Sequence, residues 1–82
     1  MVKVAILYFA GARDVVRKRQ ELIDVGSRAT AGDVLNHIIR EHPGLRPMKK
    51  SLRISVNSEV VGPSAVVREG DEIGVLPPVA GG

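Results

Sequence analysis

The segment VAILYF, residues 4–9, is apolar at every position. Side chains along a strand alternate between its two faces, so both faces of this segment would meet apolar surroundings. Such a run is typical of a strand in the interior of a sheet that is covered on both faces. The segment therefore predicts a sheet built around an N-terminal strand.

One segment has the spacing of an amphipathic helix that packs against such a sheet. Thr30 is a candidate N-cap, and Asp33, three residues later, can complete a weaker form of the capping box. The helix would run from Ala31 to about His42 and end before Pro43, because a residue that precedes proline disfavours helical backbone angles. Its apolar stripe comprises Val34, Leu35, Ile38 and Ile39.

Four other segments are expected to be strands. QELIDV (20–25) follows a turn-like AGARD and a basic stretch, and is the expected hairpin partner of the first strand. SLRISV (51–56) alternates with period two, and EVV (59–61) follows a tight turn at Asn57 and Ser58. EIGVL (72–76) is the last strand. The predicted order is two strands, one helix and two or three strands, without repeats or linkers.

A single helix can cover only one face of this sheet. Some of Ala5, Leu7, Phe9 and the residues of the final strand should therefore form an exposed apolar patch, and such patches commonly mark partner surfaces. Alternatively, loop residues such as Leu45 and Met48 fold over the second face. In that case the same residues belong to the core.

Composition limits the function classes. The chain has 82 residues and no cysteine, so it is expected to be a single domain without disulfides, thiolate metal sites or a catalytic cysteine. The N-terminal apolar run is too short to span a membrane and its charged region is too small for a signal peptide. Without a targeting segment, the expected location is the cytoplasm, and no membrane is expected as a partner.

Twelve Lys and Arg residues against nine Asp and Glu residues give a net charge of +3. The basic residues gather in two clusters, Arg17 to Arg19 and Lys49, Lys50 and Arg53. With one Tyr and one Phe in the chain, there is no aromatic platform for stacking bases. A solvated basic rim or a docking patch is therefore expected rather than a nucleic-acid site.

The usual catalytic and metal-binding patterns are missing from the sequence. His37 and His42 would lie roughly 140° apart around a helix, so they do not share a face for a metal. A surface position or a helix terminus is expected for both. There is no nucleophile elbow and no glycine-rich phosphate loop. The acidic residues of the segment 69–72 are expected to be solvated at a turn.

The chain ends in LPPVAGG, residues 76–82. This can be a frayed end, because termini tolerate disorder. However, Pro77 and Pro78 favour an extended exit from the domain, and Gly81 and Gly82 lack Cβ atoms, so that a partner's active site can close around bare backbone. The terminal carboxylate is a poor electrophile, and a mixed anhydride with a nucleotide phosphate is the obvious activation, which implies a partner that uses ATP.

Three segments, VAILYFAGARD, VNSEVV and EGDEIGVLPPVAGG, resemble the small subunits of molybdopterin synthase, which are MoaD-type sulfur carriers of the ubiquitin-like β-grasp class. The resemblance implies an α+β fold, a β-grasp mixed sheet of four or five strands with one main helix packed on one face. Residues 1–76 would form this domain and residues 77–82 an extended tail. The basic stretch at Arg17 to Arg19 departs from relatives, which often have a glycine there.

The resemblance also implies a function. Gly82 would be adenylated by a ubiquitin-activating-like adenylyltransferase and then thiocarboxylated with sulfur from a donor such as a cysteine desulfurase. The tail would insert into the large subunit of molybdopterin synthase, and the sulfur would pass to cyclic pyranopterin monophosphate. The residues implied for insertion are Pro77, Pro78, Val79, Ala80 and Gly81, and those implied for the large-subunit interface are Leu7, Phe9 and Leu76.

The same resemblance implies a heterotetramer of two carriers and two large subunits. The chain alone would not be catalytic and would bind no cofactor or metal, since ATP is used by the activating partner. Three alternatives are open: a sulfur carrier for thiazole and thiamine synthesis, a ubiquitin-like modifier that is joined to lysines, and a non-covalent interaction domain.

Overall fold

Five strands pair into one mixed sheet in the computed structural model, which describes residues 1–77. The strands are β1 (Val2–Tyr8), β2 (Gln20–Val25), β3 (Arg53–Val56), β4 (Glu59–Val61) and β5 (Glu72–Leu76). Their order across the sheet is β2-β1-β5-β3-β4. The central pair β1 and β5 is parallel, and the other pairs are antiparallel. The predicted strands and the mixed β-grasp sheet are confirmed.

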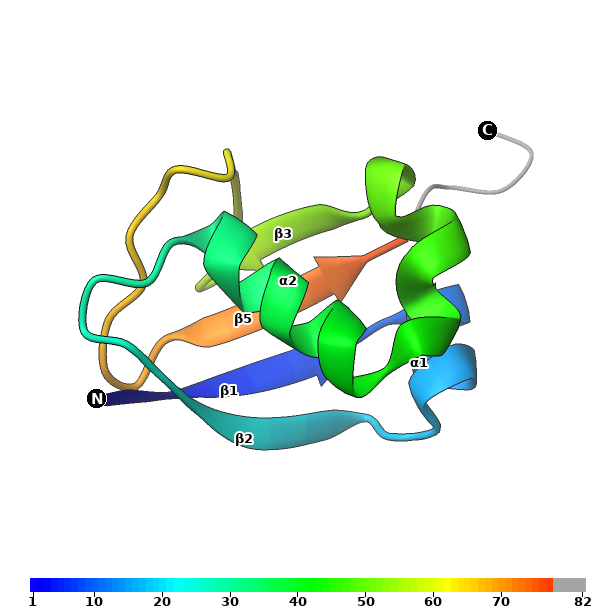
Figure 1. Cartoon of the computed structure of the whole chain (residues 1–82), viewed down its shortest axis with the longest axis horizontal. Helices are drawn as coiled ribbons and strands as arrows, with labels where there is room; N and C mark the ends of the chain where they lie inside the picture. The colour runs from blue at the N-terminus through cyan, green and yellow to red at the C-terminus, as the bar shows by residue number, and fades with distance from the viewer. Residues whose placement is uncertain (78–82) are drawn as a thin grey trace.

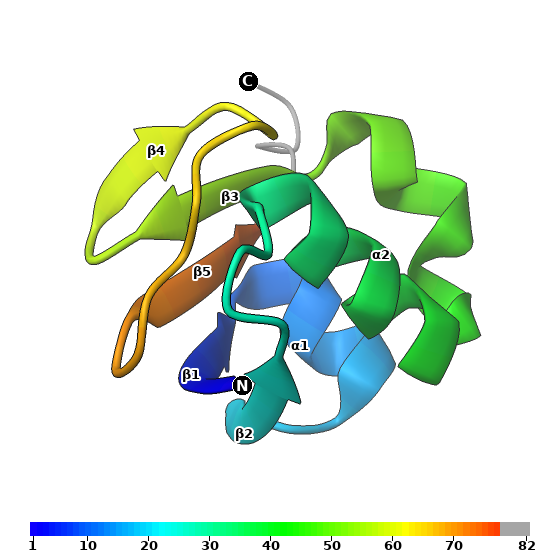
Figure 2. The same cartoon turned by 60° about the vertical axis from the view of Figure 1, so that its left-hand side comes forward.

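The helical segments lie on one side of the sheet and at one end of it (Figure 1). They are α1 (Ala10–Val16), α2 (Ala31–Glu41) and the 3-10 helix η1 (Pro43–Ser51). Figure 2 shows α2 crossing one face of the sheet. The segments α1 and η1 contact each other and close the end of the core at which β1 and β5 finish. Among residues 1–77, no helix combines the length and the apolar character that crossing a bilayer requires.

The helix α2 forms where its pattern predicts. The Oγ1 of Thr30 accepts a hydrogen bond from the backbone N–H of Asp33 at 3.2 Å, and Asp33 Oδ2 accepts one from the N–H of Thr30 at 3.0 Å. This reciprocal pair is a complete capping box, which satisfies two of the N–H groups that a helix start leaves unpaired. The helix ends at Glu41, and His42 is its C-cap.

One hydrophobic core lies between α2 and the sheet. The side chains of Val4, Ile6 and Tyr8 alternate toward α2 and are almost completely buried. Ile73 and Val75 of β5 lie on the same face and are fully buried. Burial of a large aliphatic side chain contributes about 1.5–3 kcal/mol relative to its exposure. This single layer, not a double one, therefore provides most of the stabilisation.

The structure overturns the expectation that both faces of the first strand are covered, and it excludes the alternative in which a loop covers the second face. The run 4–9 was expected to be covered on both faces, but Ala5 and Leu7 lie on the face away from α2 and are only half-buried. The loop that contains Leu45 was the alternative cover for that face. Leu45 is instead fully buried in the core on the side of α2, where η1 packs against α2. The second face is therefore left uncovered by residues 1–77.

The segment that follows β1 is the other correction. Residues 10–14 were expected to form a turn, but they begin the helix α1. Ala12 and Val16, one helical turn apart, are buried against the core. A helix of seven residues is unstable alone, because nucleation is costly. Packing against η1 and the ends of β1 and β5 therefore determines this helix, and its local sequence does not.

Candidate functional site

The face of the sheet opposite α2 presents apolar side chains at the surface. We call it the open sheet face; its apolar residues are Ala5, Leu7, Phe9, Leu22, Val60, Gly74 and Leu76. Phe9 is 44% exposed and Val60 is 61% exposed, whereas Leu7 and Leu76 are half-buried. The predicted exposed apolar patch is therefore present, and Phe9 is not an ordinary core residue.

Strand register brings these residues together. Leu7 of β1 is directly opposite Gly74 of β5, and Gly74 is opposite Ser55 of β3. Ser55 is opposite Val60, so one row of side chains crosses four strands. These residues and Phe9 border a shallow hollow of about 200 Å³. Val60 and Gly74 were not predicted as site residues, although the period-two alternation of their strands places them on this face.

Gly74 is required by the close approach of two neighbours. A Cβ at this position would collide with the Oγ of Ser55 and would lie 3.3 Å from Cε2 of Phe9. The Phe9 ring therefore rests over the bare backbone of β5 on the open sheet face. Glycine here shapes the surface on which Phe9 sits.

The described chain leaves the sheet beside Phe9. The strands β1 and β5 are parallel, so their C-terminal ends lie at the same edge of the sheet. The N–H of Phe9 donates a hydrogen bond to the carbonyl oxygen of Val75 at 3.3 Å. Leu76 ends β5, and Pro77 is half-buried next to it. The predicted tail residues Pro78, Val79, Ala80, Gly81 and Gly82 lie outside the described residues.

The opposite side of β1 carries a polar cluster. The phenol of Tyr8 donates a hydrogen bond to Oε2 of Glu21, and Nε2 of His42 donates to the same oxygen at 2.8 Å. The rings of Tyr8 and His42 meet edge to face, with centroids 5.9 Å apart. The ammonium of Lys18 lies 3.4 Å from Oε1 of Glu21. The cluster joins the ends of β1, β2 and α2, behind the open sheet face.

The cluster changes the pKa of two of its members. Burial, the hydrogen bond to Glu21 and the negative charge of that carboxylate all raise the pKa of Tyr8 well above its ordinary value. Burial acts to raise the pKa of Glu21 as well. The hydrogen bonds from Tyr8 and His42, with the positive charges of His42 and Lys18, outweigh burial and hold the pKa of Glu21 below its ordinary value. The phenol therefore stays protonated and the carboxylate ionised near neutral pH.

This cluster was not predicted from the sequence. The available signal was Tyr8, because a tyrosine on a buried strand face needs a hydrogen-bond partner. Glu21 follows the alternation of β2, which turns residues 21, 23 and 25 toward the core side. His42 was expected at a helix terminus, and that position is confirmed. The arrangement orders the fold, and it offers no nucleophile.

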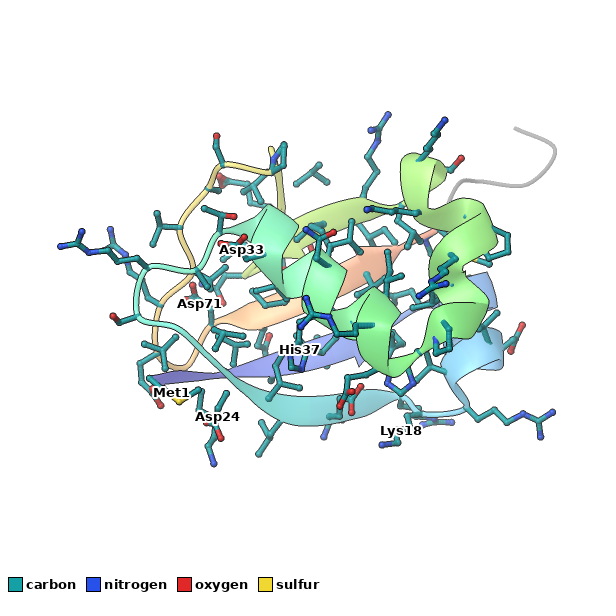
Figure 3. The ribbon with its side chains drawn as sticks, viewed as in Figure 1. Met1, Lys18, Asp24, Asp33, His37 and Asp71 are labelled. Carbon is teal, nitrogen blue, oxygen red and sulfur yellow. The ribbon has the colours of Figure 1, made fainter. Side chains whose placement is uncertain are left out.

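The structure shows no metal centre in the part of the chain that it describes: residues 1–77 contain no group of three or more His, Cys, Asp or Glu side chains placed to hold an ion. His37 lies on α2, away from His42 and near Asp24 and Asp33 in a surface hollow (Figure 3).

The carboxylates near β5 stabilise a turn. Asn57 Nδ2 donates a hydrogen bond to Asp71 at 3.0 Å, and Asn57 Oδ1 accepts one from the N–H of Glu72 at 3.0 Å. The carboxylate of Glu69 accepts a hydrogen bond from the N–H of Lys3. The segment VNSEVV thus meets the start of EGDEIGVL in space, and these contacts join the turn between β3 and β4 to the start of β5.

Comparisons with known proteins agree with this architecture. A model of the ThiS family matches residues 6–82. A molybdopterin synthase sulfur carrier subunit from Chlamydomonas reinhardtii is 32% identical over 83 residues, which cover 99% of this chain and 100% of the relative.

Two solved structures have the same fold. A putative molybdopterin converting factor, subunit 1, from Pyrococcus furiosus superposes with a TM-score of 0.87 at 28% identity, over 96% of this chain and all of that one. The small archaeal modifier protein 1 of Haloferax volcanii superposes with a TM-score of 0.84 at 25% identity, over 96% of this chain and all of that one. By the extent of the family match and the level of identity, the chain belongs to the ThiS family.

Proposed function

We propose that this chain is the sulfur carrier of molybdopterin synthase and that its chemistry takes place at the carboxylate of Gly82. The observation that carries the proposal is the position of the open sheet face, whose Phe9 borders the point where Leu76 and Pro77 lead into the Gly-Gly tail. A partner that receives the tail can hold the apolar face at the same time. The similarity to sulfur carrier subunits over the whole chain supports the same role.

The reaction sequence needs two partners before sulfur transfer. The Gly82 carboxylate attacks the α-phosphate of ATP on an adenylyltransferase related to ubiquitin-activating enzymes, which gives an acyl adenylate and releases pyrophosphate. A cysteine desulfurase as donor would carry the sulfur as a persulfide, whose outer sulfur displaces AMP and gives an acyl disulfide. A thiol then reduces this acyl disulfide, which leaves the thiocarboxylate on Gly82 and a disulfide as the by-product. The adenylate makes this displacement possible, because the free carboxylate is a poor electrophile. The chain itself binds no cofactor in this scheme, and activation by ATP fits a cytoplasmic location.

The third partner is the large subunit of molybdopterin synthase. The open sheet face would dock on it, and residues 77–82 would enter its active site. The thiocarboxylate sulfur would attack a carbon of cyclic pyranopterin monophosphate there and displace an oxygen substituent from it, which gives a thioester. Water would then cleave the bond between the acyl carbon and the sulfur, so that the sulfur stays on the pterin and the carrier returns to its carboxylate form. Two carriers on a dimer of large subunits would give the expected heterotetramer.

A second candidate is a protein modifier, in which the activated Gly82 is joined to lysine amines of other proteins. The structural likeness to the small archaeal modifier protein 1 favours it as the alternative. Both candidates use the same activated carboxylate, and only the final nucleophile differs. A sulfur carrier for thiazole synthesis would also form the thiocarboxylate, and its acceptor would differ.

Intact-mass measurement tests the proposal. The chain is incubated with the adenylyltransferase, ATP and a sulfide source, beside a variant that lacks Gly82. We expect the full chain to exchange one oxygen for sulfur and the variant to remain unchanged, with the same thermal unfolding midpoint for both. Adducts on other proteins that survive denaturation would favour the modifier. Sulfur transfer by the variant would contradict every covalent role for Gly82.

A further inference from the structure

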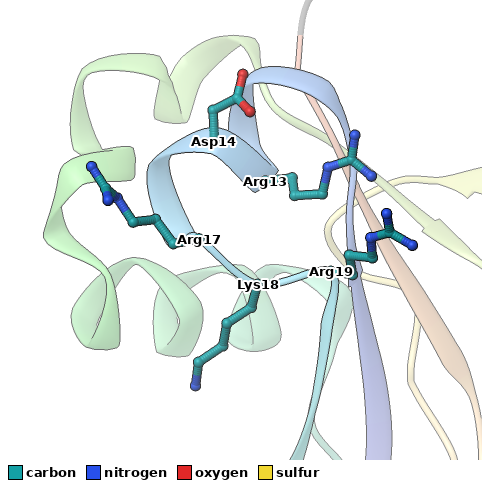
Figure 4. Close-up of a pocket in the computed structure, with 5 residues that line it drawn as sticks. All are labelled: Arg13, Asp14, Arg17, Lys18 and Arg19. Carbon is teal, nitrogen blue, oxygen red and sulfur yellow. The ribbon is translucent and has the colours of Figure 1, made fainter.

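Three consecutive basic residues, Arg17, Lys18 and Arg19, separate α1 from β2. We call them the basic segment. Together with Arg13 and Asp14, they line a surface hollow of about 370 Å³ (Figure 4). Arg13 and Arg19 point to one side of α1 in this view, and Arg17 and Lys18 point to the other. Four basic side chains and one carboxylate thus line the hollow.

Most of this positive charge has no partner in the described part of the chain. Lys18 forms an ion pair with Glu21 at 3.4 Å, and its side chain is 53% exposed, so the pair is weak. Within residues 1–77, the guanidinium groups of Arg13, Arg17 and Arg19 form no ion pair with a carboxylate. All three residues are exposed. The hollow therefore presents a local excess of positive charge to solvent.

The backbone of Arg17 adds an independent observation. Arg17 is the C-cap of α1 and has φ 65° and ψ 30°, which is the left-handed conformation. Its N–H donates a hydrogen bond to the carbonyl oxygen of Arg13 at 2.7 Å. Glycine is the residue that this position favours, since a Cβ raises the free energy of left-handed backbone. Arg17 thus occupies a conformation that costs free energy for any residue with a Cβ, and such outliers cluster at functional sites.

Backbone contacts place the basic segment beside the proposed docking face. The N–H of Tyr8 donates a hydrogen bond to the carbonyl oxygen of Arg19 at 2.9 Å, and the next N–H, that of Phe9, bonds to Val75. The basic segment therefore lies at the same edge of the sheet as Phe9 and the end of β5. The basic hollow and the open sheet face therefore lie at the same end of the sheet, where Leu76 and Pro77 leave it.

We propose that Arg17 and Arg19, with Arg13, dock onto carboxylates that border the cleft of the large subunit into which the tail enters. This inference rests on the proposed function. It goes further in requiring negatively charged side chains around the cleft of the large subunit. A protein partner is favoured over a nucleic acid because the basic hollow lies at the same end of the sheet as an apolar face and has no aromatic side chain for stacking bases. Charges at the rim of an interface mainly accelerate association and make its rate depend on salt.

The test compares two double variants that remove the same charge from opposite ends of the molecule. Arg17→Gln with Arg19→Gln neutralises the basic segment and leaves the Lys18 pair intact. Arg28→Gln with Arg68→Gln is the matched control, since both residues are exposed and lie at the end where β1 begins. Figure 3 shows this end, marked by Met1 and Asp24, far from Lys18. Association with the purified large subunit is followed by stopped-flow fluorescence at low and high salt.

We expect the first double variant to associate about 10-fold more slowly than the wild type at low salt, with the difference vanishing at high salt. The association rate of the control double variant should fall much less at low salt. Arg17→Gly should associate more slowly while its thermal unfolding midpoint rises, a combination that a merely structural role for Arg17 does not produce.

Equal association rates for the two double variants would overturn the inference and leave the proposed function standing. Failure of the wild-type chain to bind the large subunit at all would overturn both. A labelled single-stranded oligonucleotide serves as the competing probe. If it binds the wild type and not the first double variant, while association with the large subunit is unchanged, the basic segment is a nucleic-acid site and the inference is wrong.

Discussion

Glu21 accepts hydrogen bonds from Tyr8 and His42 through one carboxylate oxygen, and this makes it the most connected side chain among the described residues. Its side chain is 20% exposed, so water screens these contacts only in part. Hydrogen bonds to a charged group contribute about 1.5–3 kcal/mol each when they are well formed. The stability of the junction between β1, β2 and α2 should therefore depend on the charge of this one group.

The first prediction concerns acid unfolding. The pKa of Glu21 is lowered by folding from its ordinary value of 4.5, so its contribution is fully present above that pH and is lost as the pH falls through the folded-state pKa. Glu21→Gln should lower the unfolding free energy by about 1–2 kcal/mol at pH 7 and by less at pH 3. Urea unfolding of both proteins at several pH values measures this difference.

Asp24→Asn, on the exposed side of the same strand, is the matched control, because Asp24 has no hydrogen-bond or ion-pair partner within residues 1–77. A loss of stability for Glu21→Gln that is the same at pH 7 and pH 3 would show that packing, and not the charge of Glu21, holds the junction.

At the same scale, Asn57 shows how far a sequence can be interpreted. The turn at Asn57 and Ser58 was predicted from residue type, and both residues have positive φ, as a tight hairpin turn requires. The hydrogen bonds from the Asn57 side chain to Asp71 and Glu72 join residues that are 14 and 15 positions apart. No local pattern specifies that contact, because it exists only after β3 and β5 have paired.

The helices and strands differ in how far their own local sequence specifies them. The helix α2 and the strands were predictable, since a capping box, an apolar stripe and period-two alternation are all patterns of residues that are close together in the sequence. The helix α1 was not, because only Ala12 and Val16 face the core and the segment is too short to be helical alone. Leu45 of η1 is buried where η1 packs against α2, and its burial depends in the same way on tertiary packing.

The C-cap of α1 gives the second prediction. Arg17→Gly should raise the unfolding free energy by about 0.5–1 kcal/mol, because glycine relieves the cost of the left-handed backbone at φ 65°. Thermal and urea unfolding measure the change. Arg19→Gly is the matched control: Arg19 has no positive φ, so glycine there should only add entropy to the unfolded chain. If both variants lose stability, the conformation of Arg17 carries no cost.

At the scale of the whole molecule, the sheet has one covered face and one open face. Phe9, the basic segment and the end of β5 lie together at one end of it. The sequence predicts one main helix, which can cover only one face of the sheet, so the other face was expected to be uncovered. The structure places Leu7, Phe9 and Leu76 on that face. The sequence did not predict that the Phe9 ring would pack over Gly74. It also did not predict that the basic segment would lie at the same end of the sheet as Phe9. These relations follow from the parallel pairing of β1 and β5, which brings residues 67 positions apart to one edge of the sheet.

The last prediction tests whether that end is a docking surface. Phe9 is 44% exposed and is also the N-cap of α1, with extended backbone and no side-chain capping bond. Phe9→Ser therefore removes an exposed aromatic ring and supplies a hydroxyl at a position where serine caps a helix. Folding stability should change by less than about 1 kcal/mol, because the gain of a cap offsets the loss of partial burial.

Affinity for the large subunit should nevertheless fall about 30-fold, since aromatic side chains at the centre of an interface commonly contribute about 2 kcal/mol. Calorimetric titration of the large subunit with each purified variant measures the change. Val66→Ser is the control, because Val66 is 51% exposed and does not border the open sheet face. An unchanged affinity for Phe9→Ser would mean that the large subunit binds the tail alone. The open sheet face would then not be its docking surface.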